Sequence, residues 1–304
     1  MQENKKGKII KGVGGFYYIH LPDNRILECK AKGVFRNQNI KPTVGDNVLI
    51  DIIDEQALTG NIVDILPRDN SLIRPMVSNV DQAVIIFALS DPKPNFNLLD
   101  RFLIMMDKQQ LKTIICLNKA DLVPYQDAEE IKSIYEACGY EVIITSTYSI
   151  EDRDGEAKTG VDELQEKIKG KTTVFAGPSG VGKSSLLNAI NPNAMVQTGS
   201  ISEKIKRGKH TTRHSELIWV GEDTYIMDTP GFSSLFVEEM ECERLREYYN
   251  EFDEYQDSCR FIGCVHINEP DCGVKKALSQ GKLSELRYDN YKQLYEELKA
   301  KKRW

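Results

Sequence analysis

The stretch Thr172–Ser184, TTVFAGPSGVGKS, decides the fold, together with the run SLLNAI that follows it at Ser185–Ile190. The β-branched and apolar residues of Thr172–Ala176 predict a buried strand, and the spacing in Ser185–Ile190 predicts the first turns of an amphipathic helix. Glycines between the two let backbone N–H groups turn toward phosphates, where the helix N-terminus adds the positive end of its dipole. This strand–loop–helix context predicts a P-loop nucleotide-binding domain.

Residues in and after this loop predict the phosphate and magnesium contacts. Lys183 would bring a positive charge to the β- and γ-phosphates, and the Ser184 hydroxyl would bind Mg²⁺. Asp228 follows the predicted strand Thr224–Met227 and would hold Mg²⁺ directly or through water. The D-x-x-G motif that begins at Asp228 would place the backbone N–H of Gly231 against the γ-phosphate. This motif is an ordinary turn when it stands alone, but here it falls at a workable distance after the loop.

A second motif predicts which base is bound. Asn118–Asp121, NKAD, follows the predicted buried strand Thr113–Leu117. The carboxylate of Asp121 would accept hydrogen bonds from N1–H and the N2 amino group of guanine, which adenine does not offer in that arrangement. Ser146, after the predicted strand Glu141–Ile144, marks a backbone element that would brace the guanine O6. The base motif therefore favours guanine and disfavours an ATPase or kinase, the main competing enzyme classes.

The order of these motifs along the chain is unusual. In an ordinary small GTPase the glycine loop opens the domain and N-K-x-D comes near its end. Here N-K-x-D comes first, followed by the Ser146 element, the glycine loop, Thr211-Thr212 and finally D-x-x-G. A parallel sheet can be entered at a different strand without changing the site when the native termini lie close together. The sequence therefore predicts a circularly permuted GTPase domain.

A cysteine and histidine cluster predicts a metal centre near the C-terminus. Cys259-x₄-Cys264-x-His266-x₅-Cys272 supplies three thiolates and one imidazole, the ligand set of a closed tetrahedral zinc site. The loop has little apolar content, so a bound metal would supply its folding energy. This spacing is not a standard finger pattern, and free cysteines beside a surface histidine are the alternative. The remaining cysteines are interpreted as small buried hydrophobes: Cys29, Cys116, Cys138 and Cys242.

The N-terminal part predicts a small β-barrel, because short strands recur between turns up to about residue 67. These strands are expected at Lys8–Lys11, Phe16–Ile19, Ile26–Cys29, Asn47–Ile53 and Gly60–Ile65. Basic residues gather around Phe35, which suggests an RNA-facing groove with an aromatic platform. A solvated charged face with Phe35 in the core is an equally good interpretation. The basic residues in question are Lys30, Lys32, Arg36 and Lys41.

Composition limits where the protein acts. A chain of 304 residues is long enough for two or three domains, and the net charge of −6 means that RNA affinity must come from local patches. No segment approaches the ~20 apolar residues that cross a bilayer. Met1–Lys6 lacks the apolar region of a signal peptide. We therefore expect a cytoplasmic protein with no membrane contact. Helical spacing in Lys282–Trp304 ends in a basic tail, which suits either rRNA contact or a solvated helix end.

On these motifs the chain resembles the RsgA family, also called YjeQ or YloQ. The resemblance covers essentially the whole chain and implies a circularly permuted GTPase that acts in maturation of the small ribosomal subunit. It implies an OB-like RNA-binding barrel in residues 1–68, the GTPase domain in 69–234 and a mostly helical zinc-binding domain in 235–304. The implied cofactors are GTP or GDP, Mg²⁺ and one Zn²⁺. The implied partner is the small (30S) subunit with its 16S rRNA, and the protein is expected to be a monomer.

The resemblance also assigns residues to roles. Zinc would be held by Cys259, Cys264, His266 and Cys272, and Mg²⁺ by Ser184, Thr212 and Asp228. Lys183, Thr212 and His210 are the predicted catalytic residues. The predicted nucleotide contacts are Asn118, Lys119, Asp121, Ser146, Gly177, Ser179, Gly180, Val181, Gly182, Lys183, Ser184, Ser185, Thr212, Asp228 and Gly231.

The predicted switch region indicates slow intrinsic hydrolysis. In Ras-like enzymes a glutamine after D-x-x-G orients the attacking water, but Phe232 occupies that position and cannot hydrogen-bond. Thr212, matched to the family's H-T-T pattern, would bind Mg²⁺ and sense the γ-phosphate. His210 is the candidate water-orienting residue, and an ordinary surface histidine is an equal alternative.

These inferences predict a GTPase that assists late maturation of the small subunit. Hydrolysis would be stimulated by the subunit and would drive release from it. The alternative is a nucleotide-gated RNA-binding module whose hydrolysis is incidental. Subunit-dependent turnover distinguishes the two functions.

Overall fold

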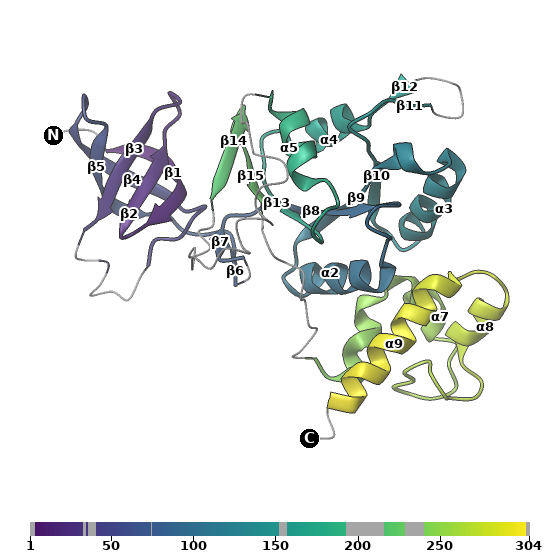
Figure 1. The fold of residues 1–304 in the computed structure, drawn as a ribbon. Coiled ribbons are helices and arrows are strands. Elements are labelled where there is room, and N and C mark those ends of the chain that lie inside the picture. The colour runs from purple at the N-terminus through teal and green to yellow at the C-terminus, as the bar shows by residue number, and fades with distance from the viewer. Residues whose placement is uncertain are drawn as a thin grey trace, which may run out of the picture. The chain divides into compact units, whose positions relative to one another are not determined.

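A computed structural model describes residues 4–32, 35, 41–73, 75–151, 157–192, 216–228 and 240–301 (Figure 1). The described residues divide into two compact units. One contains residues from 1–83, 162–176 and 183–230, and the other contains residues from 84–161, 177–182 and 231–304. Several predictions fall outside the described ranges, namely those for Arg36, His210, Thr212, Gly231, Phe232 and the end of the basic tail.

The N-terminal barrel is closed and has five strands in the order β1-β2-β3-β5-β4 (Figure 1). Its fully buried residues alternate along the strands, as expected when one face of each strand points into a barrel. Phe35 is 5% exposed, so it belongs to the core and the aromatic-platform interpretation of this residue is wrong. The strands, all predicted, are β1 Lys5–Val13, β2 Phe16–His20, β3 Ile26–Ala31, β4 Asn47–Asp54 and β5 Thr59–Ile65.

The segment after the barrel is fixed to it by buried polar contacts. The guanidinium of Arg68 donates to both carboxylate oxygens of Asp46, at 2.6 and 2.8 Å, and Asp46 is fully buried. The Asn79 side chain donates to the carbonyl of Gly45 at 3.0 Å. Two short strands, β6 Ser71–Leu72 and β7 Val77–Ser78, pair within the segment. These residues therefore form an ordered extension of the barrel rather than an unstructured linker.

The central sheet has six strands in the order β10-β9-β8-β13-β15-β14. β10 pairs in parallel with β9 and β13 with β15, whereas β14 is antiparallel to β15. The sequence predicts β9, β10, β13 and β15 of this sheet but not β14. The two residues between β14 and β15, Glu222 and Asp223, both have positive φ, which is the geometry of a tight hairpin turn. The bounds are β8 Gln82–Ala88, β9 Lys112–Asn118, β10 Glu141–Ile144, β13 Thr172–Ala176, β14 Leu217–Gly221 and β15 Thr224–Asp228.

Helices accompany this sheet, and α5 is the helix that the spacing in Ser185–Ile190 predicts. α2 begins after Asn95, whose side chain accepts a hydrogen bond from the backbone of Leu98 and so satisfies a free N–H group of the first turn. Its buried residues include Leu99, Phe102 and Met106, and Phe102 packs edge-on against Phe87 of β8. The bounds are α2 Phe96–Lys108, α3 Tyr125–Glu136, α4 Val161–Ile168 and α5 Lys183–Ile190, and the minor strands β11 Ile150–Glu151 and β12 Ala157–Lys158 form a separate hairpin.

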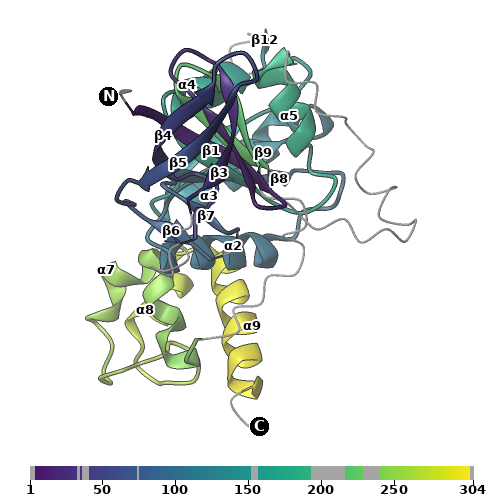
Figure 2. The same ribbon diagram turned by 90° about the vertical axis from the view of Figure 1, so that its left-hand side faces the viewer.

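The C-terminal region is mostly helical, as predicted, and has an aromatic core. Phe252 and Tyr249 each lie edge-on to Tyr291, with ring centroids 5.0 Å apart. Figure 2 shows α7 and α8 to one side of the long helix α9. Among the described residues, no helix combines the length and apolar character that a membrane span requires. The elements are the 3₁₀ turns η4 Cys242–Tyr248 and η5 Asn250–Phe252, and the helices α7 Asp253–Gln256, α8 Gly273–Ser279 and α9 Glu285–Lys301.

A buried ion-pair network joins α9 to α2. The side chain of Arg287 is 2% exposed and donates to Asp100 on α2 and to Glu251 in η5. Asp100 also accepts from Asn290 at 2.7 Å and from Tyr135 at 3.1 Å. Burial raises the pKa of Asp100, and the charge of Arg287 opposes that rise. The C-terminal region is therefore held to α2 and α3 by buried charged groups. These groups contact one another in place of water.

Replacing Arg287 by leucine tests this network. The substitution leaves Asp100 and Glu251 buried without their cation, so we expect the free energy of unfolding to fall by about 3–5 kcal/mol. Urea unfolding followed by tyrosine and tryptophan fluorescence measures the change. Arg244→Ala, which breaks an exposed pair with Glu247, is the control and should leave the midpoint nearly unchanged. Equal midpoints for Arg287→Leu and the wild type would contradict the assignment.

Candidate nucleotide site and metal cluster

The base motif lies at the end of two neighbouring parallel strands. Leu117 of β9 is opposite Ile144 of β10, so the loops after both strands leave the sheet at the same edge. Lys119 adopts a left-handed conformation, with φ 59°, and Asp121 lies in the 3₁₀ turn η1, Ala120–Leu122. The structure therefore brings the predicted N-K-x-D residues together with Ser146.

Asn118 holds the base loops and the phosphate loop together. Its side chain is nearly fully buried, donates to the carbonyl of Val181 at 2.8 Å and accepts from the hydroxyl of Thr145 at 3.0 Å. The sequence predicts Asn118 as a nucleotide contact, but it gives no sign of Thr145 as its partner. The amide thus fixes the position of the phosphate loop relative to the base motif.

Ser146 positions Asp121 through its side chain. The Ser146 hydroxyl donates to a carboxylate oxygen of Asp121 at 2.5 Å. The Ser146 backbone N–H donates to the carbonyl of Thr159 at 2.9 Å, so in this structure it is not turned toward a ligand. The next backbone N–H belongs to Thr147, which is exposed. The predicted contact of Ser146 with guanine O6 stays a prediction.

The glycines of the phosphate loop occupy positions that no side chain fits. Gly177 and Gly182 have φ values of 145° and 95°. A Cβ atom would lie 2.1 Å from the carbonyl oxygen of Ile86 at Gly177, and 2.3 Å from the amide nitrogen of Asn118 at Gly182. Ser179 and Gly180 are exposed at the tip of the loop, whereas Val181 is buried beneath it. The loop is thus drawn tightly onto β8 and Asn118, with its tip free for phosphates.

The residues predicted to meet Mg²⁺ and the terminal phosphates lie at the start of α5 and the end of β15. Burial lowers the pKa of Lys183, and the nearby negative charge of Asp228 opposes that change. Asp228 pairs in register with Phe175, two residues before the phosphate loop begins. Ser184 and Ser185 are half-buried in the first turn of α5. A carboxylate and a hydroxyl beside a lysine fit a Mg²⁺–phosphate group, because Mg²⁺ prefers oxygen ligands.

The four predicted zinc ligands form one cluster, with ligand atoms all within 4.8 Å of one another. Nδ1 of His266 lies 3.6 Å from the sulfur of Cys259 and 3.4 Å from that of Cys272, and these two sulfurs are 3.8 Å apart. A tetrahedral zinc site with Zn–S of about 2.3 Å and Zn–N of about 2.05 Å requires an S···S distance of about 3.8 Å and an N···S distance of about 3.5 Å. The donor set and its spacing therefore fit one zinc ion.

The surroundings of the cluster also fit a cation. Burial raises the pKa of the Cys264 thiol to about 12 and lowers the pKa of His266 to about 4, so thiolates there need a positive partner. Backbone N–H groups of Gly273 and Lys275 donate to the sulfurs of Cys259 and Cys272. Hydrogen bonds of this kind stabilise thiolate ligands and fix their orientation.

Three residues that the sequence analysis did not single out shape the metal loop. The Glu269 carboxylate accepts from the backbone of Val265 at 2.8 Å and of Ile267 at 3.0 Å. On α9, the hydroxyl of Tyr288 donates to the carbonyl of His266 at 2.7 Å, and that of Tyr291 to the carbonyl of Val265 at 2.6 Å. The two tyrosines are three residues apart and so share a face of α9. That spacing was the available signal.

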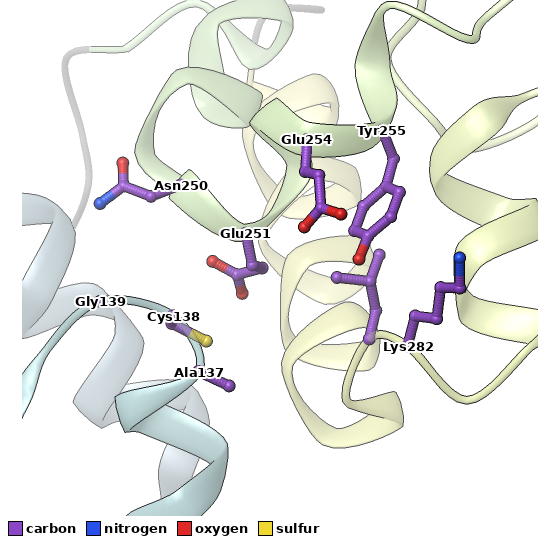
Figure 3. Close-up of a pocket in the computed structure, with 9 residues that line it drawn as sticks. Ala137, Cys138, Gly139, Asn250, Glu251, Glu254, Tyr255 and Lys282 are labelled. Carbon is purple, nitrogen blue, oxygen red and sulfur yellow. The ribbon is translucent and has the colours of Figure 1, made fainter.

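A hollow of about 280 Å³ beside the end of α3 has no such set of groups (Figure 3). Glu251, on its wall, is bound by Arg287, and the Cys138 thiol donates to the carbonyl of Ile134. Burial raises the pKa of Cys138 to about 12, so this thiol is neutral and a poor nucleophile. Glu254, Tyr255 and Lys282 are among the other residues that line it. We assign no chemistry to this hollow.

Gly182→Ala tests the geometry of the phosphate loop. The new methyl group would collide with the Asn118 amide and would have to adopt a positive φ, so the loop must move away from the base motif. We expect GDP affinity to fall at least tenfold, about 1.4 kcal/mol, as measured by isothermal titration calorimetry. Gly139→Ala also has a positive φ but open space around it, and it should leave GDP affinity unchanged. Equal effects on affinity would contradict the collision.

Removing one thiol tests the metal cluster. Metal analysis of the purified protein should give one zinc per chain, and Cys272→Ser should lower this occupancy and the thermal unfolding midpoint together. Cys138→Ser is the control, because it keeps a hydrogen-bond donor outside the cluster and should retain the zinc. Full zinc occupancy in Cys272→Ser would show that this cysteine is not a ligand.

Comparison with known proteins shows relatives along the whole chain. A model of the RsgA GTPase matches residues 65–238, more than half of the chain, and a model of the RsgA N-terminal domain matches residues 6–61. The small ribosomal subunit biogenesis GTPase RsgA of Agathobacter rectalis is 56% identical over 308 residues, which cover 98% of this chain and 99% of that protein. The protein of the same name from Alkaliphilus metalliredigens is 48% identical and covers 98% of this chain and 99% of its own.

Two solved structures are similar over nearly the full length. The crystal structure of YjeQ from Thermotoga maritima has a TM-score of 0.78 and 35% identity, covering 97% of this chain and 99% of that one. The structure of YloQ, a circularly permuted GTPase, has a TM-score of 0.75 and 38% identity, covering 98% and 96%. With the permuted order of the base and phosphate motifs, these matches show that the chain belongs to the RsgA family of circularly permuted GTPases.

Proposed function

We propose that this chain hydrolyses GTP on the small ribosomal subunit, assists late maturation of that subunit and is released by the hydrolysis. The observation that carries the proposal is the Asn118 amide, which joins the guanine motif to the phosphate loop in a member of the RsgA family. Relatives over nearly the whole chain are named small ribosomal subunit biogenesis GTPases. That name supports the small ribosomal subunit as the partner and GTP hydrolysis as the reaction.

The site residues divide the work among base, phosphates and metal. Asp121, oriented by Ser146, would read the edge of guanine. Lys183 would hold the β- and γ-phosphates, because its charge lies in a partly desolvated position next to Asp228. Mg²⁺ would neutralise charge on the phosphate oxygens when bound, and Ser184, Asp228 and Thr212 would hold it. Zinc at the Cys259 cluster would be structural, because all four ligand positions are filled by protein.

We propose a residue that orients the attacking water. Phe232 stands where Ras-like enzymes have a glutamine and has no hydrogen-bonding group. His210, in the sequence next to Thr211-Thr212, could orient water with a neutral imidazole. We propose that small-subunit binding places His210, which accounts for a requirement for the subunit.

Contacts with 16S rRNA are proposed for the barrel. The ammonium nitrogen of Lys30, on β3, lies 4.9 Å from the ring centroid of Phe16, its partner on β2. Tyr17 and Tyr18 follow Phe16 on the same strand. An aromatic ring next to a cation suits base stacking and phosphate contact. With Phe35 in the core, Phe16 replaces it as the proposed aromatic contact. We further propose that the protein is a cytoplasmic monomer, as a ribosome-bound GTPase requires access to assembling subunits.

Hydrolysis assays test the proposed function. We expect slow hydrolysis of GTP but not ATP by the zinc-replete protein, and a large rise with purified small subunits but not with large ones. Asp121→Ala should weaken GDP binding at least tenfold by removing two charge-assisted hydrogen bonds, whereas Asp127→Ala, an exposed carboxylate on α3, should not. If small subunits do not change the rate of GTP hydrolysis, the subunit-stimulated step is refuted and only GTP binding is supported.

A further inference from the structure

The edge of the proposed guanine site is defined, but its faces are not. Asp121 and Ser146 are in contact at the ends of the β9 and β10 loops and would meet the Watson–Crick edge of the base. The flat faces of a purine are apolar and gain by contact with apolar or aromatic side chains. Residues of these two loops, next to Asp121 and Ser146 in the chain, are therefore candidates to cover a face.

Lys119 is placed to cover one face. Its ammonium group donates to the carbonyl of Asp91, so the end of the side chain is held away from the base motif. The same side chain passes the phosphate loop, since Cε lies 3.9 Å from where a Cβ of Gly182 would be. The ammonium end of Lys119 is thus fixed at Asp91, and its four-carbon stem would offer an apolar surface to a base bound at Asp121.

Tyr148 is an exposed aromatic residue next to the proposed edge of the base site. It is two residues beyond Ser146, and its backbone N–H donates to the Ser146 hydroxyl at 2.9 Å, the same hydroxyl that donates to Asp121. The side chain is 71% exposed, whereas Tyr135, Tyr249 and Tyr291 are fully buried. The ring is therefore exposed close to the carboxylate that would read the base, where a planar base could stack on it.

We propose that the ring of Tyr148 stacks on the guanine base, on the face opposite the stem of Lys119. This inference rests on the proposed GTP site and names a residue that binds the base without reading its edge. Tyr148 would raise affinity for the nucleotide, and Asp121 would select guanine. Leu122, 51% exposed and next to Asp121, borders the same region and contributes apolar surface at its rim.

Titration calorimetry with GDP tests the stacking. Tyr148→Ala should weaken GDP binding about fivefold to a hundredfold, the range for loss of one base–aromatic stack, and Tyr148→Phe should restore it to within about twofold. Ile53→Ala, which removes a side chain 65% exposed on β4, is the control and should bind GDP like the wild type. The thermal unfolding midpoint without nucleotide should be the same for all variants.

The outcomes separate this inference from the function on which it rests. A wild-type protein that binds neither GDP nor GTP would refute the GTP site itself. A wild-type protein that binds GDP, with Tyr148→Ala binding equally well, would refute only the stacking. Weak binding by both Tyr148→Ala and Tyr148→Phe would assign the effect to the hydroxyl group and also overturn the stacking. A lowered unfolding midpoint in Tyr148→Ala would mean that Tyr148 supports the loop instead of the base.

Discussion

One side-chain amide sets the geometry on which the base half of the site depends. Asn118 bonds at once to the phosphate loop, 63 residues later in the chain, and to the loop after β10. Because the amide is buried and both bonds are internal, each loop is positioned relative to the other before a nucleotide arrives. Gly182 must be a glycine for the same reason, since the amide occupies the space of a side chain there. Circular permutation leaves this arrangement intact because it changes chain order and not the contacts.

A second organising element is α9, which serves two neighbours. Arg287 and Asn290 bind Asp100 of α2, and Tyr288 and Tyr291 bind carbonyl groups of the metal loop. The metal loop leaves Phe261 and Ile262 exposed, so its shape depends on the cluster, on Glu269 and on this helix. The position of the cluster relative to α2 is therefore set by a single rigid helix.

The sequence predicts most of this architecture, because its signals are local. The barrel strands, the glycine loop and the cysteine spacing each lie within one short segment, where periodicity or residue type is informative. Phe35 shows the limit, since charge around an aromatic residue does not tell a binding platform from a core position. Ser146 shows another, because which of its groups faces a ligand depends on Thr159. The Asp100–Arg287 pair had no signal at all, as its members are far apart in sequence.

That separation bears on how the protein is made. Asp100 leaves the ribosome 187 residues before Arg287, the cation that compensates its buried charge. At synthesis rates of about 5–20 residues per second, the interval is about 10–40 s. During it, α2 cannot bury Asp100 in its final environment except as the neutral acid. The region around α2 in the nascent chain therefore stays incompletely packed until the C-terminal segment has been synthesised. A factor that works on ribosome assembly thus completes its own fold only as its translation finishes.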